Sequence, residues 1–208
     1  PTPWSLLKED DESVRLLEDA ASTFTRLVDS ALEIGYDRQW LEAWRIACLA
    51  NHPDRSEEAR NYCQELLERQ LAHPAAIAWA TTRIDGVDLK SALAELENRL
   101  AKAKLTESDT ISLTTLYWHL ERFEDAVSVL TSKKADFFKS GMETAWYSLY
   151  ANAITMAGRP DEALAAIEQS GCVEDLGFPK SNALRALKRS KPDSPELEEH
   201  LADCLART

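Results

Sequence analysis

Apolar residues recur at helical spacing along almost the whole chain. Alternating β-branched runs with hairpin turns do not occur, and only six of the 208 residues are glycine. Apolar positions three and four residues apart are typical of helices that bury one face. The pattern therefore predicts an all-α chain. Its expected helices cover residues 11–34, 39–51, 55–71, 75–85, 88–103, 107–121, 123–135, 141–157, 160–170, 179–190 and 195–206.

Residues that begin and end helices support these boundaries. Proline suits the first helical position, and three stand there: Pro74, Pro160 and Pro195. Glycine suits the left-handed residue that closes a helix, and four stand at predicted ends: Gly35, Gly86, Gly158 and Gly171. Ser140 and Glu143 have the spacing of a capping box, in which the two side chains satisfy free N–H groups of the first turn. We expect a helix to begin there.

Small residues recur at a fixed period. Ala59, Ala92, Ala126 and Ala163 are separated by 33, 34 and 37 residues. Twelve residues before each of them lies another small side chain, and this second series is Ala47, Ala80, Thr114 and Ala151. A period of about 34 with two helices per unit is typical of stacked helical hairpins. We expect the inner and outer helix of each unit to cross at these positions, and the longest spacing places three extra residues within 133–142.

With these two series in step, the chain resembles the tetratricopeptide repeat family over about residues 40–177. The resemblance implies a right-handed solenoid of helical hairpins with about four repeats. It predicts an N-terminal tail and capping helix over 1–38, four helix pairs over 39–177 and a C-terminal capping helix pair over 178–208. Capping helices would shield the apolar faces that terminal repeats expose.

The same resemblance implies a concave groove, lined by one face of each inner helix, where peptides bind. Mapped onto this chain, that face consists of Trp44, Cys48, Asn51, Ile77, Thr81, Ile84, Ile111, Thr115, Trp118, Ser148, Asn152 and Thr155. These side chains are aromatic, aliphatic or neutral, and basic partners for an acidic peptide end are missing. A partly apolar strand or an amphipathic helix fits better. Alternatively, Trp44 and Trp118 pack against neighbouring helices, with helix 11–34 or 179–190 folded into the groove.

Net charge and cysteine usage restrict the classes of partner and the cellular compartment that we expect. The formal net charge is −12 and no basic cluster offsets it. Nucleic acids and anionic membranes need a basic surface, so we expect neither as a partner. No apolar run is long enough to cross a bilayer, so we expect no direct membrane insertion. Four scattered cysteines, Cys48, Cys63, Cys172 and Cys204, suggest reduced thiols and a cytoplasmic protein, although a trimmed fragment of a secreted or anchored protein would look the same.

Candidate catalytic groups are few. The sequence contains no glycine-rich phosphate loop, no His-Glu-x-x-His and no Gly-x-Ser-x-Gly. Cys48 and His52 share a helix face, but two ligands do not make a metal site, and we expect a packed thiol near a solvated imidazole. Three acidic pairs stand at predicted helix starts, where the helix dipole explains them: Asp10-Asp11, Glu57-Glu58 and Asp161-Glu162. We therefore expect no catalytic, cofactor or metal site.

These observations favour a non-catalytic scaffold that binds a protein or peptide partner in a weakly charged groove. The rival hypothesis is an accessory repeat domain of a larger enzyme or export assembly, for example in polysaccharide synthesis or glycosyl transfer. The sequence leaves the partner and the oligomeric state open.

Overall fold

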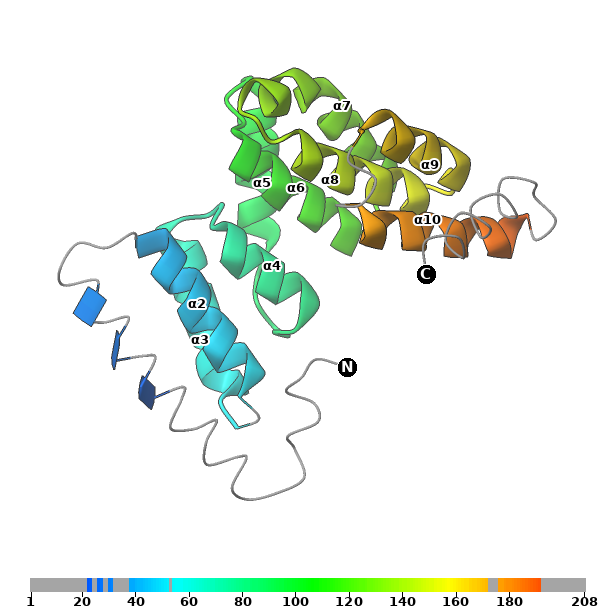
Figure 1. Ribbon diagram of the computed structural model, residues 1–208. Coiled ribbons are helices and arrows are strands. Elements are labelled where there is room, and N and C mark those ends of the chain that lie inside the picture. The colour runs from blue at the N-terminus through cyan, green and yellow to red at the C-terminus, as the bar shows by residue number, and fades with distance from the viewer. Residues whose placement is uncertain are drawn as a thin grey trace, which may run out of the picture. The chain divides into compact units, whose positions relative to one another are not determined.

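The computed structural model describes residues 22–23, 26–27, 30–31, 38–52, 54–171 and 176–191 (Figure 1). From residue 38 onward these described residues form nine α-helices and no strand, which confirms the all-α class. The helices are α2 (Arg38–Asn51), α3 (Ser56–Arg69), α4 (Pro74–Thr82), α5 (Lys90–Ala101), α6 (Glu107–His119), α7 (Phe123–Lys139), α8 (Glu143–Met156), α9 (Pro160–Gln169) and α10 (Gly177–Ser190). Most of predicted helix 11–34 and all of helix 195–206 lie outside the described residues, as do Asp10-Asp11, Gly35, Cys172, Pro195 and Cys204.

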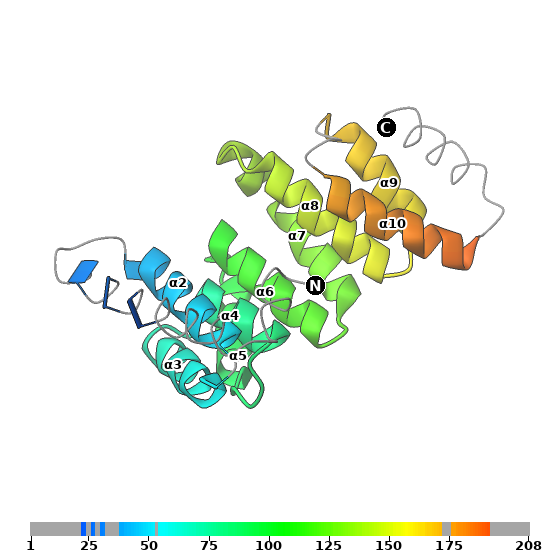
Figure 2. The same ribbon diagram turned by 60° about the horizontal axis from the view of Figure 1, so that its bottom comes forward.

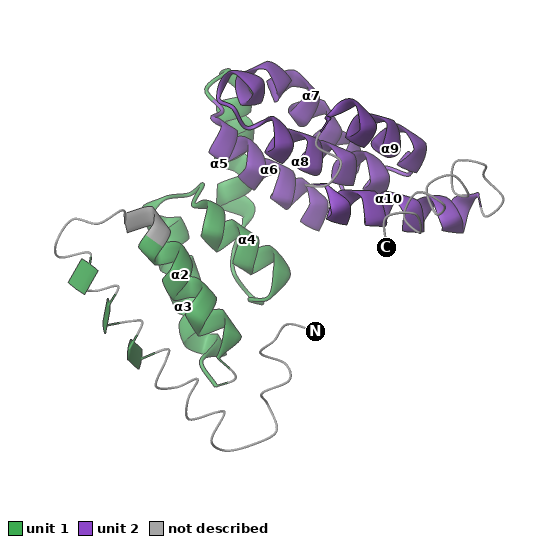
Figure 3. Ribbon diagram, in the orientation of Figure 1, with its two compact units in different colours: residues 1–104 green, residues 105–208 purple. Residues whose placement is uncertain are grey.

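The chain divides into two compact units, residues 1–104 and 105–208 (Figure 3). The boundary falls between α5 and α6, that is, between the second and third predicted helix pairs. The expected division at residues 38 and 177 stays a prediction.

In unit 1, α2, α3 and α4 each pack against the other two. Ile46 of α2, Leu66 of α3 and Ile77 of α4 are among the fully buried side chains of this core. Cys63 of α3 is also buried, and its Sγ donates to the carbonyl of Ala76 at 3.2 Å. Within the described part of this unit, α5 makes no comparably broad contact with the other three helices, although Ala92 on its surface is buried.

In unit 2, each helix packs against the next in the chain, from α6 to α9, and α10 contacts both α8 and α9 (Figure 2). The connections cover only residues 120–122, 140–142 and 157–159, so consecutive helices from α6 to α9 run in opposite directions. The largest buried side chains of this core include Leu113, Leu130, Phe137, Ile154 and Ile167. The apolar core of unit 2 is therefore supplied by all four helices from α6 to α9.

Six of the eight periodic small residues are fully buried. The outer series, Ala59, Ala92, Ala126 and Ala163, is at most 1% exposed throughout. In the inner series, Thr114 and Ala151 of unit 2 are also fully buried, whereas Ala47 and Ala80 of unit 1 are only half-buried. Both series are thus buried in unit 2 and only the outer series in unit 1. Of the helix pairs expected to cross at these residues, α2/α3, α6/α7 and α8/α9 pack against each other, whereas α4 and α5 form no comparably broad contact.

Four turns after helices share one closing geometry. A residue with positive φ follows each helix, and the next N–H bonds to a carbonyl five residues back. Gly141 and Gly158 fill this position after α7 and α8 with φ of 70° and 82°, whereas Ala103 and Glu121 fill it after α5 and α6 with φ of 53° and 58°. A glycine in the sequence therefore identifies only some of the helix ends that are closed by a left-handed residue.

The expected capping box at Ser140 is wrong. Ser140 closes α7, where its Oγ donates to the carbonyl of Asp136 at 2.9 Å and to the carboxylate of Glu107, and α8 begins without a side-chain cap. A capping box lies instead at the start of α6: Thr106 Oγ1 accepts from the Asp109 N–H at 3.1 Å, and Asp109 Oδ2 accepts from the Thr106 N–H at 3.2 Å. The extra residues expected within 133–142 extend α7 to Lys139.

Candidate functional site

The predicted groove residues of unit 2 begin with a stripe on α6. Ile111, Thr115 and Trp118 lie three or four residues apart and are all half-buried, so each keeps part of its side chain accessible. Thr115 Oγ1 donates to the carbonyl of Ile111 at 2.9 Å, a bond within its own helix. The Trp118 indole N–H is buried and has no hydrogen-bond partner. We call these three residues the α6 stripe.

The continuation of this face on α8 is partly closed. Ser148 is half-buried, but Thr155 is 7% exposed and its Oγ1 donates to the carbonyl of Ala151. Asn152 Oδ1 accepts from Asn182 Nδ2 of α10 at 3.1 Å. Thr155 therefore belongs to the buried face and not to an open groove, while Asn152 is half-buried and bonded to α10, which packs on α8.

Unit 1 also differs from the expected groove. Ile77 is fully buried and Ile84 is 5% exposed, because α4 packs against both α2 and α3 and ends at Thr82, before Ile84. These two isoleucines are core residues and not groove residues. Asn51 Oδ1 accepts from Arg83 Nη1 at 2.9 Å, which ties it to the end of α4.

The remaining predicted residues of unit 1 stay accessible to different degrees. Trp44 is 47% exposed, and Cys48 and Thr81 are half-buried. Burial raises the pKa of the Cys48 thiol, and it raises that of the buried Cys63 to about 12. Both thiols are therefore protonated near neutral pH and are poor nucleophiles.

The His52 imidazole is not solvated as expected. It is 6% exposed, and its Nδ1 accepts from the Asp54 N–H at 3.2 Å, just after α2 ends at Asn51. Among the described residues, no three His, Cys, Asp or Glu side chains gather in a group that could hold a metal ion.

A buried ionic cluster in unit 1 was not anticipated from the sequence. Glu42 of α2 is 5% exposed, and its carboxylate lies 3.0 Å from Arg69 Nη2 of α3 and 3.3 Å from His73 Nε2. The His73 Nδ1 accepts from the Ala76 N–H at 3.3 Å and so caps the start of α4. The proton of a neutral ring must then reside on Nε2, where it is donated to Glu42.

This cluster is structural. Burial lowers the pKa of His73, although the Glu42 carboxylate acts in the opposite direction. His73 is 1% exposed and its Nδ1 is occupied by a backbone donor, so neither ring nitrogen can reach a substrate. The sequence gives one local indication of this role: His73 stands immediately before Pro74, at the N-cap position of α4.

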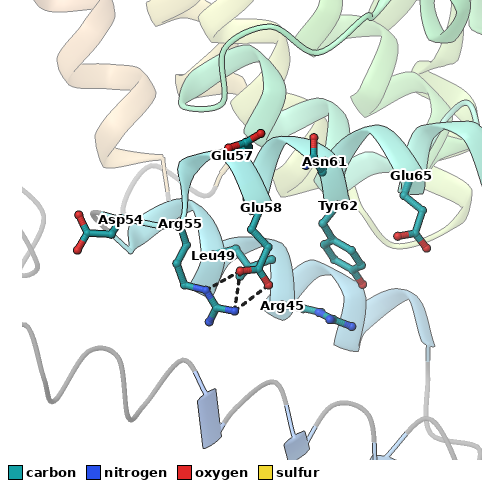
Figure 4. Close-up of a pocket in the computed structure, with 9 residues that line it drawn as sticks. All are labelled: Arg45, Leu49, Asp54, Arg55, Glu57, Glu58, Asn61, Tyr62 and Glu65. Carbon is teal, nitrogen blue, oxygen red and sulfur yellow. Dashed lines mark hydrogen bonds and ion pairs between the residues drawn. The ribbon is translucent and has the colours of Figure 1, made fainter.

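A hollow of about 540 Å³ lies over α2 and α3 of unit 1 (Figure 4). Arg55 forms two hydrogen bonds of 2.7 Å with the Glu58 carboxylate, and the Arg45 guanidinium lies 4.6 Å from the centre of the Tyr62 ring. Nine residues line this hollow, and none of them is a predicted groove residue. Arg45 and Leu49 are about a quarter-turn from Trp44 and Cys48 on α2, so the hollow is on another side of that helix.

Two acidic pairs stand where they were expected. Glu57-Glu58 and Asp161-Glu162 occupy the first turns of α3 and α9, so the favourable interaction with the helix dipole accounts for their placement. None of the described helices combines the length and the apolar character needed to span a bilayer.

Comparisons with known proteins return no match: no family model, no curated protein and no solved structure is similar to this chain.

Proposed function

We propose that this protein is a non-catalytic interaction module built from tetratricopeptide-like helix pairs, and that it binds a partner protein or peptide through the α6 stripe. The repeat reading is supported by the two periodic series of small residues, which are both fully buried in unit 2. Under this proposal α6/α7 and α8/α9 are successive repeats, and α10 packs on α8 and α9 as the first helix of a further unit would.

The observation that carries the proposal is the character of the α6 stripe. Its three side chains are uncharged and partly accessible, in a protein whose net charge is −12. The hydroxyl of Thr115 bonds only within its own helix, so a partner that docks here need not break a side-chain hydrogen bond between Thr115 and another helix. A surface carried on rigid helices loses little entropy when a partner docks.

The stripe favours one class of partner. Aromatic and aliphatic side chains bind apolar side chains by excluding water, and binding energy concentrates on central aromatic residues such as Trp118. An amphipathic helix or a partly apolar strand can supply such side chains at regular spacing. The absence of lysine and arginine from the stripe disfavours a peptide recognised by its carboxylate.

Site-specific photo-crosslinking tests the proposal. A photoreactive phenylalanine analogue is introduced in cells at Thr115, and separately at Ser128, an exposed residue of α7. We expect discrete adducts from position 115 that are absent from position 128, and mass spectrometry identifies the partner. Equal adduct patterns at both positions would refute the assignment of the stripe. An adduct within one longer polypeptide would support the accessory-domain hypothesis instead.

A further inference from the structure

Lys134 of α7 directs its ammonium group at three aromatic rings. Its Nζ lies 4.7 Å from the ring centre of Trp146, 5.1 Å from that of Phe138 and 5.6 Å from that of Tyr147. All three distances are within the range at which a cation is attracted by an aromatic ring. No carboxylate forms an ion pair with Lys134 in the described part of the chain, whereas the adjacent Lys133 is paired with Asp136 at 2.9 Å.

The three rings form one preassembled surface, here called the three-ring platform (Phe138, Trp146 and Tyr147). Phe138 and Trp146 are 5.9 Å apart and inclined by 75°, and Trp146 and Tyr147 are 5.1 Å apart and inclined by 80°. Phe138 and Tyr147 complete the triangle at 5.8 Å. Steeply inclined rings that touch one another present several ring faces and edges around a single point, and the Lys134 ammonium occupies that point.

The platform is held in place independently of Lys134. The Trp146 indole N–H donates to the carbonyl of Leu130 at 2.7 Å, and its ring stacks on Tyr150 at 4.4 Å with an inclination of 18°. Trp146 and Tyr147 are also largely buried in the contact between α7 and α8. If the lysine side chain swings into solvent, these contacts keep the two rings where they are.

We propose that the three-ring platform is a binding site for small alkylammonium cations and that Lys134 occupies it in cis. Lys134 is exposed and is linked to the helix by a flexible chain, so an external cation can displace its ammonium group. Quaternary ammonium groups are recognised by aromatic cages through this same attraction. The inference rests on α7 and α8 alone and does not depend on the proposed role of the α6 stripe.

Tetramethylammonium is the probe for the first test, observed by its own methyl proton NMR signal at constant ionic strength. Ring currents move this signal upfield when the cation lies against aromatic faces. We expect Lys134→Ala to bind the cation saturably and at least about threefold more tightly than the unsubstituted protein, because the competing ammonium is gone. Lys133→Ala is the matched control, since it removes the same charge one residue away without uncovering the platform.

A second substitution shows whether the rings hold the cation. Adding Phe138→Ala to Lys134→Ala removes one wall of the platform and should abolish the saturable shift. The inference is overturned if Lys134→Ala and Lys133→Ala respond equally, or if the loss of Phe138 changes nothing. Choline and an Nε-trimethyl-lysine amide, titrated in the same way, distinguish a headgroup-like ligand from a methylated lysine of a partner.

A separate measurement observes Lys134 itself in the unsubstituted protein. Reductive methylation with ¹³C-formaldehyde turns each lysine into a dimethylated ammonium, and Lys134→Arg identifies the Lys134 signal by its disappearance. We expect that signal upfield of those from solvent-exposed lysines. A Lys134 signal at the ordinary position would show that the rings do not hold an ammonium group, and would overturn the inference whatever the alanine variants do.

Discussion

Replacing Ala126 with Leu should destabilise unit 2, because this alanine lies where α7 meets its neighbouring helices. Ala126 is 0% exposed, and α7 packs broadly against both α6 and α8. Because neighbouring atoms already cover Ala126 completely, the added isopropyl group of leucine has to displace a neighbouring helix or adopt an unfavourable rotamer. Ala163 of α9 has the same burial and the same place in the period.

Two effects of opposite sign compete at this position. Burying the larger side chain without steric conflict would stabilise the fold by about 1.5–3 kcal/mol. Neither alanine lines any of the hollows of 540, 330 and 240 Å³. Overpacking in a filled core costs about 1–3 kcal/mol, and we expect this cost to dominate at both positions.

The assay is the free energy of unfolding from urea titrations followed by circular dichroism. Ala135 of α7 and Ala165 of α9 are the matched controls, because they are exposed on the same two helices. Their substitution by Leu should change the free energy of unfolding by less than about 0.5 kcal/mol. Equal losses at buried and exposed positions, or a gain at Ala126 and Ala163, would show that the small residues do not mark tight helix contacts.

Two further predictions concern backbone strain and pH. Gly158→Ala should lower the free energy of unfolding by about 0.5–1 kcal/mol because Gly158 has φ of 82°, whereas Gly177→Ala should raise it by a similar amount because Gly177 lies in α10 with ordinary φ. No atom obstructs a new Cβ at either site. Thermal melts in which both variants shift in the same direction would contradict this reasoning. For His73, burial lowers the folded-state pKa below the unfolded value of about 6.5, so its contribution to stability is complete above the unfolded value and is lost as the pH falls from there through the folded-state pKa. His73→Asn keeps an acceptor for the Ala76 N–H, so the variant should lose less stability than the unsubstituted protein between pH 7.5 and 5 in urea titrations, and identical slopes would rule out His73 as the cause.

The helices themselves could be predicted because their signal is local. Apolar spacing placed nine helices within a few residues of where the structure has them, and Pro74 and Pro160 do begin α4 and α9. The capping box failed for a local reason too. Ser140 has the right spacing to Glu143, but α7 runs on to Lys139 and uses the serine hydroxyl at its own end.

The burial of the predicted groove residues could be foreseen only in part. Ile111, Thr115 and Trp118 of α6 are half-buried, and their role in binding a partner stays a prediction. The periodic mapping could not foresee that α4 ends at Thr82 and packs on two helices, which buries Ile77 and Ile84. Packing between elements distant in the chain decides burial at such positions.

The ionic cluster and the three-ring platform depend on distant contacts as well. Glu42 and His73 are 31 residues apart and meet only because α2 packs on α4. Lys134 and Trp146 belong to different helices that a tight turn brings together. Neither arrangement has a sequence motif, because what defines each is the arrangement of rings or charges in space.

The most direct test of the proposed function is the affinity of the crosslinked partner for Thr115→Arg and Ser128→Arg. Thr115 makes no side-chain bond to another helix, and Ser128 is exposed on α7, so both variants should melt at nearly the same temperature as the unsubstituted protein. A partner held by the α6 stripe should bind Thr115→Arg at least about tenfold more weakly, since the arginine would have to be desolvated beside apolar side chains, and should bind Ser128→Arg unchanged. Unchanged affinity for Thr115→Arg, or an equal loss for both variants, would contradict the account.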